Sequence, residues 1–347
     1  MEYLPIIGLT LILILTLILP FSVKIIEEEI EIFLFLMGIL AVSISRLWSI
    51  HLIIEALKEP IPITLTVLTM GIVFKVLRKK IANLMKKLRK KLSPEKLVFL
   101  IVLTLGLFSS VITAIISAII LSEIITIVKF KREFEIKIVV LACFAIGIGA
   151  ALTPIGEPLS TIIVSKLKGE PHNADFFYLL KNMAEWIIPG IFIFSYLASR
   201  KASENITQDE GLREDYIETY KTVFFRALKV FIFIMALIFL GTGIMPLSEK
   251  FISKMPVEIL FWANSISAIL DNATLAAAEI SPILTDRQIT FILMGLIISG
   301  GILIPGNIPN IICASKLNIK SKEWAKLGLG YGLVFMLIYF FVLYFFA

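Results

Sequence analysis

The sequence predicts an all-α polytopic membrane protein, with about eight transmembrane helices, two re-entrant helical hairpins and two discontinuous helices in an inverted repeat. Three observations support this fold class. Hydrophobic residues make up 58% of the 347-residue chain, and the mean hydropathy is +0.95, which is more than a soluble core absorbs. Apolar runs long enough to cross a bilayer recur along the chain. Prolines and glycines interrupt two of these runs, at residues 153–158 and 300–309.

Charge and cysteine usage exclude several classes of function. The net charge of +6 does not indicate nucleic-acid binding, because the basic residues cluster in one segment and near the ends of apolar runs, as membrane topology requires. Cys143 and Cys313 both lie in apolar segments, so we expect buried thiols and neither a disulfide framework nor a zinc site. His51 and His172 are the only histidines, which argues against metal-centred chemistry. We therefore expect a protein that is not an enzyme and that carries no cofactor.

Residues 1–96 are predicted to form a scaffold of three spans and a basic helix. The spans are expected at about residues 4–23, 32–48 and 61–76, and the first is expected to be retained because it lacks the basic leader and Ala-x-Ala site of a signal peptide. Residues 75–96 contain ten Lys or Arg, with apolar residues between them at helical spacing. This pattern predicts an amphipathic helix on the cytoplasmic surface of the plasma membrane. Scarce glutamine beside abundant Ile, Lys and Glu points to a prokaryotic source.

Residues 97–200 are predicted to form a first repeat. The apolar run at residues 97–128 is too long for one span and too short for two. Its middle is polar and small, which predicts a re-entrant hairpin with its tip near Ser109 to Thr113. A broken span follows over residues 138–167, interrupted by Thr153-Pro-Ile-Gly-Glu-Pro158. A further span at about residues 176–197 completes this repeat.

Residues 201–256 are predicted to connect the first repeat to a second one, through a polar cytoplasmic loop and a span at about residues 223–245. The second repeat, residues 257–347, is expected to contain a hairpin over 257–283, a span over 289–317 that is broken at 300–309, and a last span over 327–346.

The two broken spans resemble each other in sequence. Residues 153–167 align with residues 303–317 at an offset of 150 residues, which pairs Gly156 with Gly306, Glu157 with Asn307, and two Ser-Lys-Leu triplets. Matching unusual residues in the same order favours a duplication. Three crossings separate the two hairpins, and an odd number inverts the second repeat. The loop charges agree with this inversion: the loops richer in Lys and Arg, expected on one side, are 75–96, 129–137, 200–226 and 316–326, while 48–60, 166–175, 246–256 and 285–287 are expected on the other.

Asp271 is the strongest candidate for a functional side chain. A charged, unpaired carboxylate near the bilayer centre is costly, so Asp271 is suited to exchanging a proton for a cation. Asn272 and Thr274 offer neutral oxygens beside it, which hard cations prefer. Glu157 follows Gly156 in the first helix break, and we expect it to face the same cavity as Asp271. The candidate cation ligands are therefore Asp271, Asn272 and Glu157.

Structural readings of the two acids stay open. Asp271 could instead have a structural role, either protonated or paired with a lysine. Glu157 could instead bind the exposed amides at the start of a helix. Further candidate ion-binding residues in the breaks and hairpins are Gly156, Gly306, Asn307, Asn310, Ser160, Thr161, Ser109, Ser110, Thr113 and Ser265. Glu123 and Glu279 occupy similar places late in each hairpin, and we expect both at the membrane interface.

Two motifs resemble a known superfamily. Residues 267–278, Ser-Ala-Ile-Leu-Asp-Asn-Ala-Thr-Leu-Ala-Ala-Ala, resemble the Asp-Asn segment of NhaD-type sodium/proton antiporters and of arsenite permeases in the ion-transporter superfamily. Gly300-Gly with Gly306-Asn-Ile-Pro-Asn310 resembles the second broken helix of that superfamily, and the nearest resemblance is to its small prokaryotic predicted cation transporter branch. The similarity covers most of the chain from about Leu97. It implies a scaffold, a moving transport unit and a homodimer, although hairpin tip residues Ser109, Ser110 and Thr113 depart from the Asn-Thr pattern.

The sequence thus predicts a secondary active transporter, with Na⁺/H⁺ antiport by alternating access preferred and Asp271 exchanging H⁺ for the cation. The alternative is a Na⁺- or H⁺-coupled transporter of arsenite or carboxylate anions. An anion site ordinarily uses an intramembrane Arg or Lys or half-helix N-termini, and Lys166 and Lys316 at span ends are the only basic residues near the hairpins and breaks. An intramembrane hydrolase using Glu157 and Asp271 has no supporting motif. A passive channel also stays open.

Overall fold

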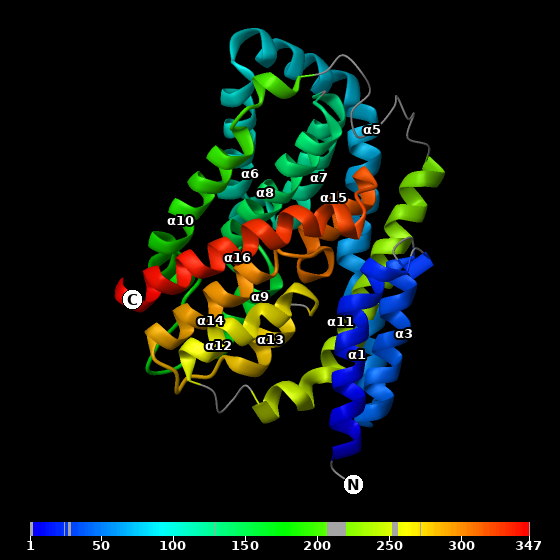
Figure 1. Cartoon of the computed structure of the whole chain (residues 1–347), viewed down its shortest axis with the longest axis vertical. Coiled ribbons are helices and arrows are strands. Elements are labelled where there is room, and N and C mark those ends of the chain that lie inside the picture. The colour runs from blue at the N-terminus through cyan, green and yellow to red at the C-terminus, as the bar shows by residue number, and fades with distance from the viewer. Residues whose placement is uncertain are drawn as a thin grey trace.

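The chain is described by a computed structural model at residues 3–23, 25–26, 29–128, 130–206, 220–251, 256–270 and 272–346. Within these ranges the regular structure is helical, and the one β feature is an isolated bridge between Phe130 and Ile206. The all-α fold class is therefore confirmed for the described residues (Figure 1). The helices, in chain order, are α1 (Tyr3–Ser22), α3 (Ile30–Ser45), α4 (Ile50–Lys58), α5 (Pro60–Lys91), α6 (Pro94–Ile112), α7 (Ala114–Ile127), α8 (Arg132–Ala150), α9 (Pro158–Lys166), α10 (Tyr178–Ser199), η1 (Ser203–Asn205), α11 (Tyr220–Phe251), α12 (Val257–Ala263), η3 (Asn264–Ala268), α13 (Asn272–Glu279), α14 (Asp286–Ser299), η4 (Ile304–Gly306), α15 (Ile308–Leu317) and α16 (Ser321–Phe346).

The length and composition of these helices fit a membrane protein. Among the described residues, three helical segments are long and apolar enough to cross a bilayer: Pro94–Ile112, Val223–Ile244 and Ser321–Phe346. Shorter apolar helices cover Pro5–Pro20, Ile30–Ser45 and Ala114–Ile127. Two helices at other predicted spans are not among these three segments. Helix α8 begins with the charged residues Arg132, Glu133 and Glu135, and α14 has only 14 residues. Large apolar side chains are exposed along α16, as contact with lipid requires.

The N-terminal helices form a separate layer with α11. Helix α11 packs against α3, α5 and α1, and Figure 1 shows α1, α3 and α11 side by side at one flank of the molecule. Close approach of α3 and α11 depends on glycine, because a methyl group on Gly38 would lie 2.8 Å from the Cβ of Phe239 and one on Gly243 would lie 2.5 Å from the Cβ of Ala41. Helix α11, which contains the span that the sequence assigned to a connection, therefore packs with the N-terminal helices.

The basic segment 75–91 is helical, as predicted, but it continues the helix of the preceding span and does not form a helix of its own. Helix α5 runs without interruption from Pro60 to Lys91 over 32 residues. The physical reason is that no proline or glycine follows Gly71 before the helix ends, so nothing in the sequence stops it. In Figure 1 the last turns of α5 cross the top of the view and bring the chain to α6.

Two segments in which a helix is followed by a turn and a second helix lie where the hairpins are predicted, and we name them hairpin 1 and hairpin 2. Hairpin 1 consists of α6 and α7, which pack against each other and meet at Thr113, a non-glycine residue with φ 74°. Its tip therefore lies at the end of the predicted interval Ser109 to Thr113. Hairpin 2 consists of α12, η3 and α13, with Asp271 between η3 and α13 outside the described residues.

Two irregular segments interrupt helices at the predicted prolines and glycines. Break 1 is residues 151–157, between α8 and α9, and break 2 is residues 300–307, between α14 and α15. Both breaks have the same local packing. A methyl group on Gly156 would lie 1.9 Å from the carbonyl oxygen of Ala150, and one on Gly306 would lie 2.5 Å from that of Gly300, six residues earlier in each case. The two breaks that align in sequence thus share this local backbone contact.

The loops gather at two ends of the molecule. At one end Arg132 forms an ion pair with Glu323 at 2.9 Å, and the carboxylate of Glu95 accepts hydrogen bonds from Ser203. At the other end His172 lies 3.0 Å from Asp286, and Arg287 donates to the carbonyl of Tyr344 at 3.3 Å. The first end contains loops that the sequence assigns to the side richer in Lys and Arg.

Helix α16 packs against break 2 at Gly328, and substitution of this glycine tests the contact. A methyl group on Gly328 would lie 2.1 Å from the carbonyl oxygen of Ile302, whereas one on Gly330 would meet no atom within 4 Å. We expect Gly328→Ala to lower the free energy of unfolding by about 1–3 kcal/mol through overpacking. Gly330→Ala is the matched control and should be neutral or stabilising by up to about 1 kcal/mol, because alanine favours the helix. Equal unfolding midpoints in a denaturant titration of the two variants would contradict this packing.

Candidate functional site

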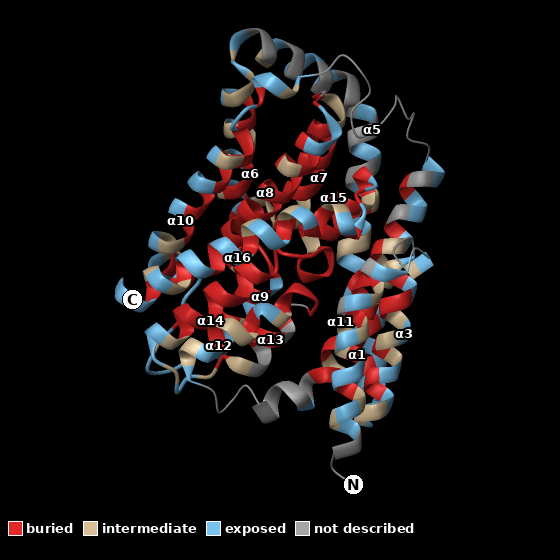
Figure 2. Cartoon of the chain, viewed as in Figure 1, coloured by how far each residue is buried: buried red, intermediate tan, exposed pale blue. Residues whose placement is uncertain are grey.

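The hairpin tips meet the helix breaks in the centre of the molecule. Helix α7 packs against α15, and α13 packs against α9. The backbone N–H of Ala114, at the tip of hairpin 1, donates to the carbonyl of Gly156 in break 1 at 3.0 Å. A methyl group on Gly306 in break 2 would lie 2.7 Å from the carbonyl oxygen of Ser267 in hairpin 2. Buried residues concentrate in this region (Figure 2).

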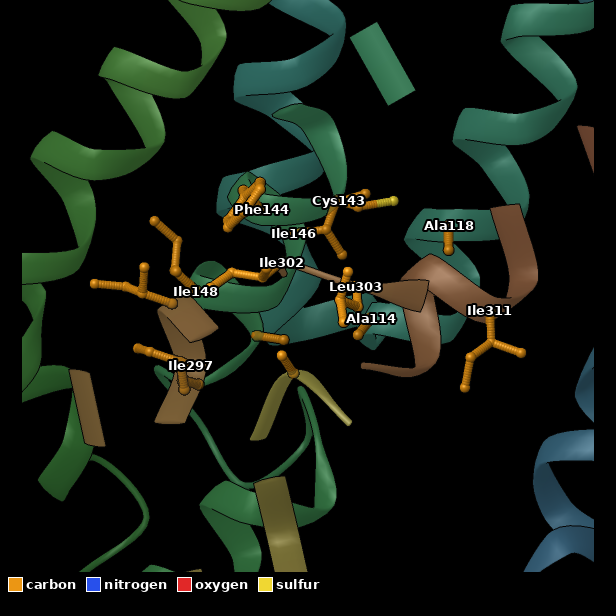
Figure 3. Packing of buried hydrophobic residues seen from close by; sticks show 14 of the residues in the cluster. Ala114, Ala118, Cys143, Phe144, Ile146, Ile148, Ile297, Ile302, Leu303 and Ile311 are labelled. Carbon is orange, nitrogen blue, oxygen red and sulfur yellow. The ribbon is translucent and has the colours of Figure 1, made fainter. Parts of the chain in front are cut away.

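Apolar side chains from four elements surround this central region. Figure 3 shows Ala118 of α7 and Ile311 of α15 on one side, with Phe144 of α8 and Ile302 of break 2 on the other. Break 2 also touches α8, because a methyl group on Gly147 would lie 2.6 Å from Nδ2 of Asn307. The breaks and hairpin tips therefore meet inside protein, which is where irregular backbone is tolerated at membrane depth.

Break 1 places one buried carboxylate in the centre. Glu157 is 6% exposed and occupies the N-cap position of α9 in an extended conformation. Its side chain makes no capping hydrogen bond to α9, so it does not seal the exposed amides of that helix in this way. Ser160 donates to the carbonyl of Ala151 at 3.0 Å, and Thr161 donates to that of Pro154 at 2.8 Å. These hydroxyls hold the shape of the break and leave Glu157 as its ionisable group.

Break 2 has a neutral amide in the equivalent place. Asn307 is the N-cap of α15, is 6% exposed, and has φ −154° where Glu157 has −157°. Asn310 is fully buried and its Nδ2 donates to the carbonyls of Gly300 at 2.9 Å and Leu303 at 2.8 Å. Asn310 therefore does in break 2 what Ser160 does in break 1. Its Oδ1 has no hydrogen-bond partner among the described residues.

The tip of hairpin 2 adds further buried polar atoms. Ser267 is fully buried and its Oγ has no partner within the described part of the chain. Asn272, the first residue of α13, is 4% exposed, and its Nδ2 likewise has no described partner. The predicted ligand Asp271 lies outside the described residues, as does the side chain of Thr274. Ser265 is exposed, and the buried hydroxyl is that of Ser267 two residues later.

The predicted hydroxyls of hairpin 1 make backbone contacts. Ser109 donates to the carbonyls of Gly106 at 2.7 Å and Ile146 at 3.0 Å, and so ties α6 to α8. Ser110 donates to the carbonyl of Leu107, and its own carbonyl accepts a hydrogen bond from Thr153 in break 1. The Oγ1 of Thr113 accepts from the N–H of Ile116 at 3.3 Å. The hydroxyls of hairpin 1 therefore fix the position of the hairpin against its neighbours, and few of their oxygens remain to bind an ion.

The structure contains a buried ion pair that the sequence reasoning missed. Glu123 on α7 and Lys316 on α15 are 5% and 4% exposed and pair with each other, so Glu123 is buried inside the protein with a cationic partner. Glu279, its counterpart late in hairpin 2, accepts from Nδ2 of Asn264 at 3.0 Å. Lys166 on α9, the counterpart of Lys316, donates to the carbonyl of Ile280 at 3.3 Å. The sequence did contain a clue to this pairing, because the two glutamates occupy matching positions in the repeat and so do the two lysines.

The local electrostatics come from helix ends as well as from side chains. Helices α7, α9 and α15 all begin at a hairpin tip or a break, so the partial positive charges of their N-termini lie in the centre. The carboxyl group of Glu157 lies at one of these N-termini, that of α9. No group of three His, Cys, Asp or Glu residues in the described ranges is placed to hold a metal ion. Cys143 and Cys313 are buried free thiols, as expected. The arrangement suits a small ion held by backbone and side-chain oxygens.

A family model described as "Protein of unknown function (DUF1646)" matches residues 6–346. The chain therefore belongs to this family. No curated protein matches the chain.

Proposed function

We propose that this member of the DUF1646 family is a secondary active transporter that exchanges Na⁺ for H⁺ across a prokaryotic plasma membrane by alternating access. The observation that carries the proposal is a pair of buried oxygens, Ser267 Oγ and Asn310 Oδ1, that have no hydrogen-bond partner among the described residues. A buried polar atom without a partner costs about 1–3 kcal/mol, so such atoms in a native fold call for a ligand or a solvent molecule.

The two residues that carry these oxygens both lie close to Gly306, which supports a shared ligand. Ser267 brings its carbonyl close to Gly306, and Asn310 binds the carbonyl of Gly300, which also lies against Gly306. Backbone carbonyls at a helix break, together with hydroxyl and amide oxygens, are ligands suited to a hard, partly dehydrated cation. Rotation of the Asn272 amide would add a further oxygen from the start of α13.

Two carboxylates are proposed to couple this cation to protons. Asp271 directly precedes Asn272 and so joins the tip of hairpin 2 to α13. Glu157 approaches the centre from break 1, at the N-terminus of α9, where negative charge is stabilised. A carboxylate that binds either a proton or the cation, and not both, gives the exchange its stoichiometric link.

The finer topology is part of the same proposal. The matching backbone of the two breaks, together with the paired packing of α7 on α15 and of α13 on α9, supports an inverted repeat with re-entrant hairpins. We assign the end that contains Arg132, Glu323 and Ser203 to the cytoplasm, following the loop charges. We also propose a homodimer and a bilayer as the setting for transport.

One observation favours a second candidate function. The N-termini of α7, α9 and α15 point partial positive charge toward the centre, which is how discontinuous helices bind anionic groups. A Na⁺- or H⁺-coupled carrier of arsenite or a carboxylate would use these helix ends in place of an arginine or lysine.

A flux assay on purified protein in sealed vesicles tests the proposal. We expect a Na⁺ or Li⁺ pulse to move protons in the opposite direction, read by a pH-sensitive dye, and Asp271→Asn and Glu157→Gln to reduce this flux at least tenfold. Glu323→Gln is the control, because it removes an acid that pairs with Arg132 at the loop end and belongs to neither break and neither hairpin tip. Wild-type exchange in Asp271→Asn would remove that residue from the mechanism, and sodium-driven uptake of arsenite or a dicarboxylate without proton movement would favour the second candidate.

A further inference from the structure

Glu279 and Asn264 form a side-chain pair inside hairpin 2. One hydrogen bond joins the two side chains, and one oxygen atom of each has no hydrogen-bond partner among the described residues. Asn264 is fully buried, and its Nδ2 donates to Glu279 Oε2 at 3.0 Å and to the carbonyl of Ile292 at 3.3 Å. The two remaining oxygens of the pair, Asn264 Oδ1 and Glu279 Oε1, are both buried and have no hydrogen-bond partner among the described residues. Both are acceptors if Glu279 is ionised.

One proton completes this pair. A protonated carboxyl group has a donor and an acceptor on one carbon, and so does a side-chain amide. With the proton on Oε1, Glu279 donates to Asn264 Oδ1 while Oε2 accepts from Nδ2, which closes an acid–amide ring. An ionised Glu279 would instead leave two acceptor atoms unsatisfied in a buried place, and buried acceptors without donors are costly.

We propose that Glu279 is a proton-binding residue of this protein, held in its protonated form by Asn264. The role of this proton in transport rests on the proposed antiport function, but its presence on Glu279 does not. The site is distinct from the cation position beside Gly306, since neither side chain is among the proposed cation ligands.

The first repeat shows which partner an ionised glutamate at this position would have. At the offset of 156 residues that pairs Ser109 with Ser265, Glu279 corresponds to Glu123 and Asn264 to Phe108. Hairpin 1 therefore has no amide for its acid, and Glu123 pairs with Lys316 instead. The amide partner is thus a property of the second repeat alone.

Lys166 is the equivalent partner for an ionised Glu279. Lys166 corresponds to Lys316 at the offset of 150 residues, and it already lies at the end of α13, where it donates to the carbonyl of Ile280. When Glu279 releases its proton to water at the end of the molecule that contains His172, the carboxylate turns from Asn264 to Lys166. One O–H bond breaks, one proton leaves, and an ion pair equivalent to Glu123–Lys316 forms.

Other charged groups on the elements around α13 have partners elsewhere. On α14, Asp286 contacts His172 and Tyr178, and Arg287 donates to the carbonyl of Tyr344. On α11, Lys229 pairs with Glu29 and Glu31. Among these described groups, Lys166 is the cation placed at the end of α13.

Infrared difference spectroscopy of the full chain in lipid tests this proposal directly. The C=O stretch of a protonated carboxylic acid is separate from that of a carboxylate, so the wild-type spectrum at neutral pH should contain an acid band that is lost in Glu279→Gln. This variant should still fold, because a glutamine amide forms the same ring with Asn264. Asn264→Leu should shift or remove the band, and the matched variant Glu123→Gln should leave it unchanged, because Lys316 keeps Glu123 ionised.

The outcomes separate this proposal from the proposed function. If Glu279→Gln keeps the acid absorption of the wild type at full intensity, or if Glu123→Gln loses the band that is assigned to Glu279, the proton site at Glu279 is wrong whatever the vesicles do. If the band is lost in Glu279→Gln and wild-type vesicles exchange cations for protons, that variant should reduce proton flux at least tenfold. If the band behaves as expected and the vesicles show no exchange, the proton site stands and the antiport proposal falls.

Discussion

Glu123→Gln is expected to lower the free energy of unfolding by about 3–5 kcal/mol, because it leaves the ammonium group of Lys316 buried without its counter-charge. Both residues are almost completely buried, and they join the last turns of α7 and α15. Removing one member of such a pair costs far more than the pair itself contributes, since the remaining charge keeps its desolvation penalty. The unfolding midpoint in a denaturant titration in mixed micelles measures the change.

An exposed pair in the same protein provides the control. Arg132 and Glu323 lie 2.9 Å apart at the loop end, with side chains 41% and 32% exposed. Water screens this pair, so Glu323→Gln should cost only about 0–1 kcal/mol. The double variant Glu123→Leu with Lys316→Met should recover most of the stability lost in Glu123→Gln, because an apolar pair of similar volume removes both desolvation penalties. Similar costs for Glu123→Gln and Glu323→Gln would show that Lys316 is solvated in the folded protein.

The helix breaks could be predicted from sequence because their cause is local. Proline removes a backbone donor and glycine lowers helix propensity, so the clustered prolines and glycines around Pro154 and Pro305 favour a helix end at each position, whereas the single Pro189-Gly190 pair stays inside α10. The tip of hairpin 1 was predictable for a related reason, since a run of small polar residues in an apolar segment indicates where a helix stops. Thr113 is at that tip, although its positive φ was not foreseen.

The partners of the buried polar side chains could not be predicted, because they depend on contacts between distant segments. Glu123 and Lys316 are 193 residues apart in the chain, and Asn264 meets Glu279 only because hairpin 2 folds back on itself. The sequence placed the two acids at matching positions and suggested a matching environment for both. The structure gives them different partners, a lysine for one and an amide for the other, and this difference is what suggests a proton on Glu279.

Exchange is expected to fall at least tenfold in Gly156→Ala and in Gly306→Ala, which alter the two breaks at equivalent positions. The added methyl groups would lie 1.9 Å from the carbonyl oxygen of Ala150 and 2.5 Å from that of Gly300, distances that backbone atoms cannot accept without moving. Each break must open, at a cost of about 1–3 kcal/mol. Opening break 1 displaces Glu157, which directly follows Gly156, and opening break 2 moves the carbonyls that flank the proposed cation position.

Gly169→Ala is the matched control, because a methyl group there would meet no atom within 4 Å. Vesicle flux and unfolding midpoints should be measured together on all three variants, so that a loss of transport can be separated from a loss of folded protein. The two breaks are expected to fail differently: Gly306→Ala should weaken the apparent affinity for Na⁺, because it moves oxygens proposed to bind the cation, whereas Gly156→Ala should chiefly shift the pH dependence, because it moves a proton-binding carboxylate. Wild-type flux in both variants would mean that ions cross the protein without using either break.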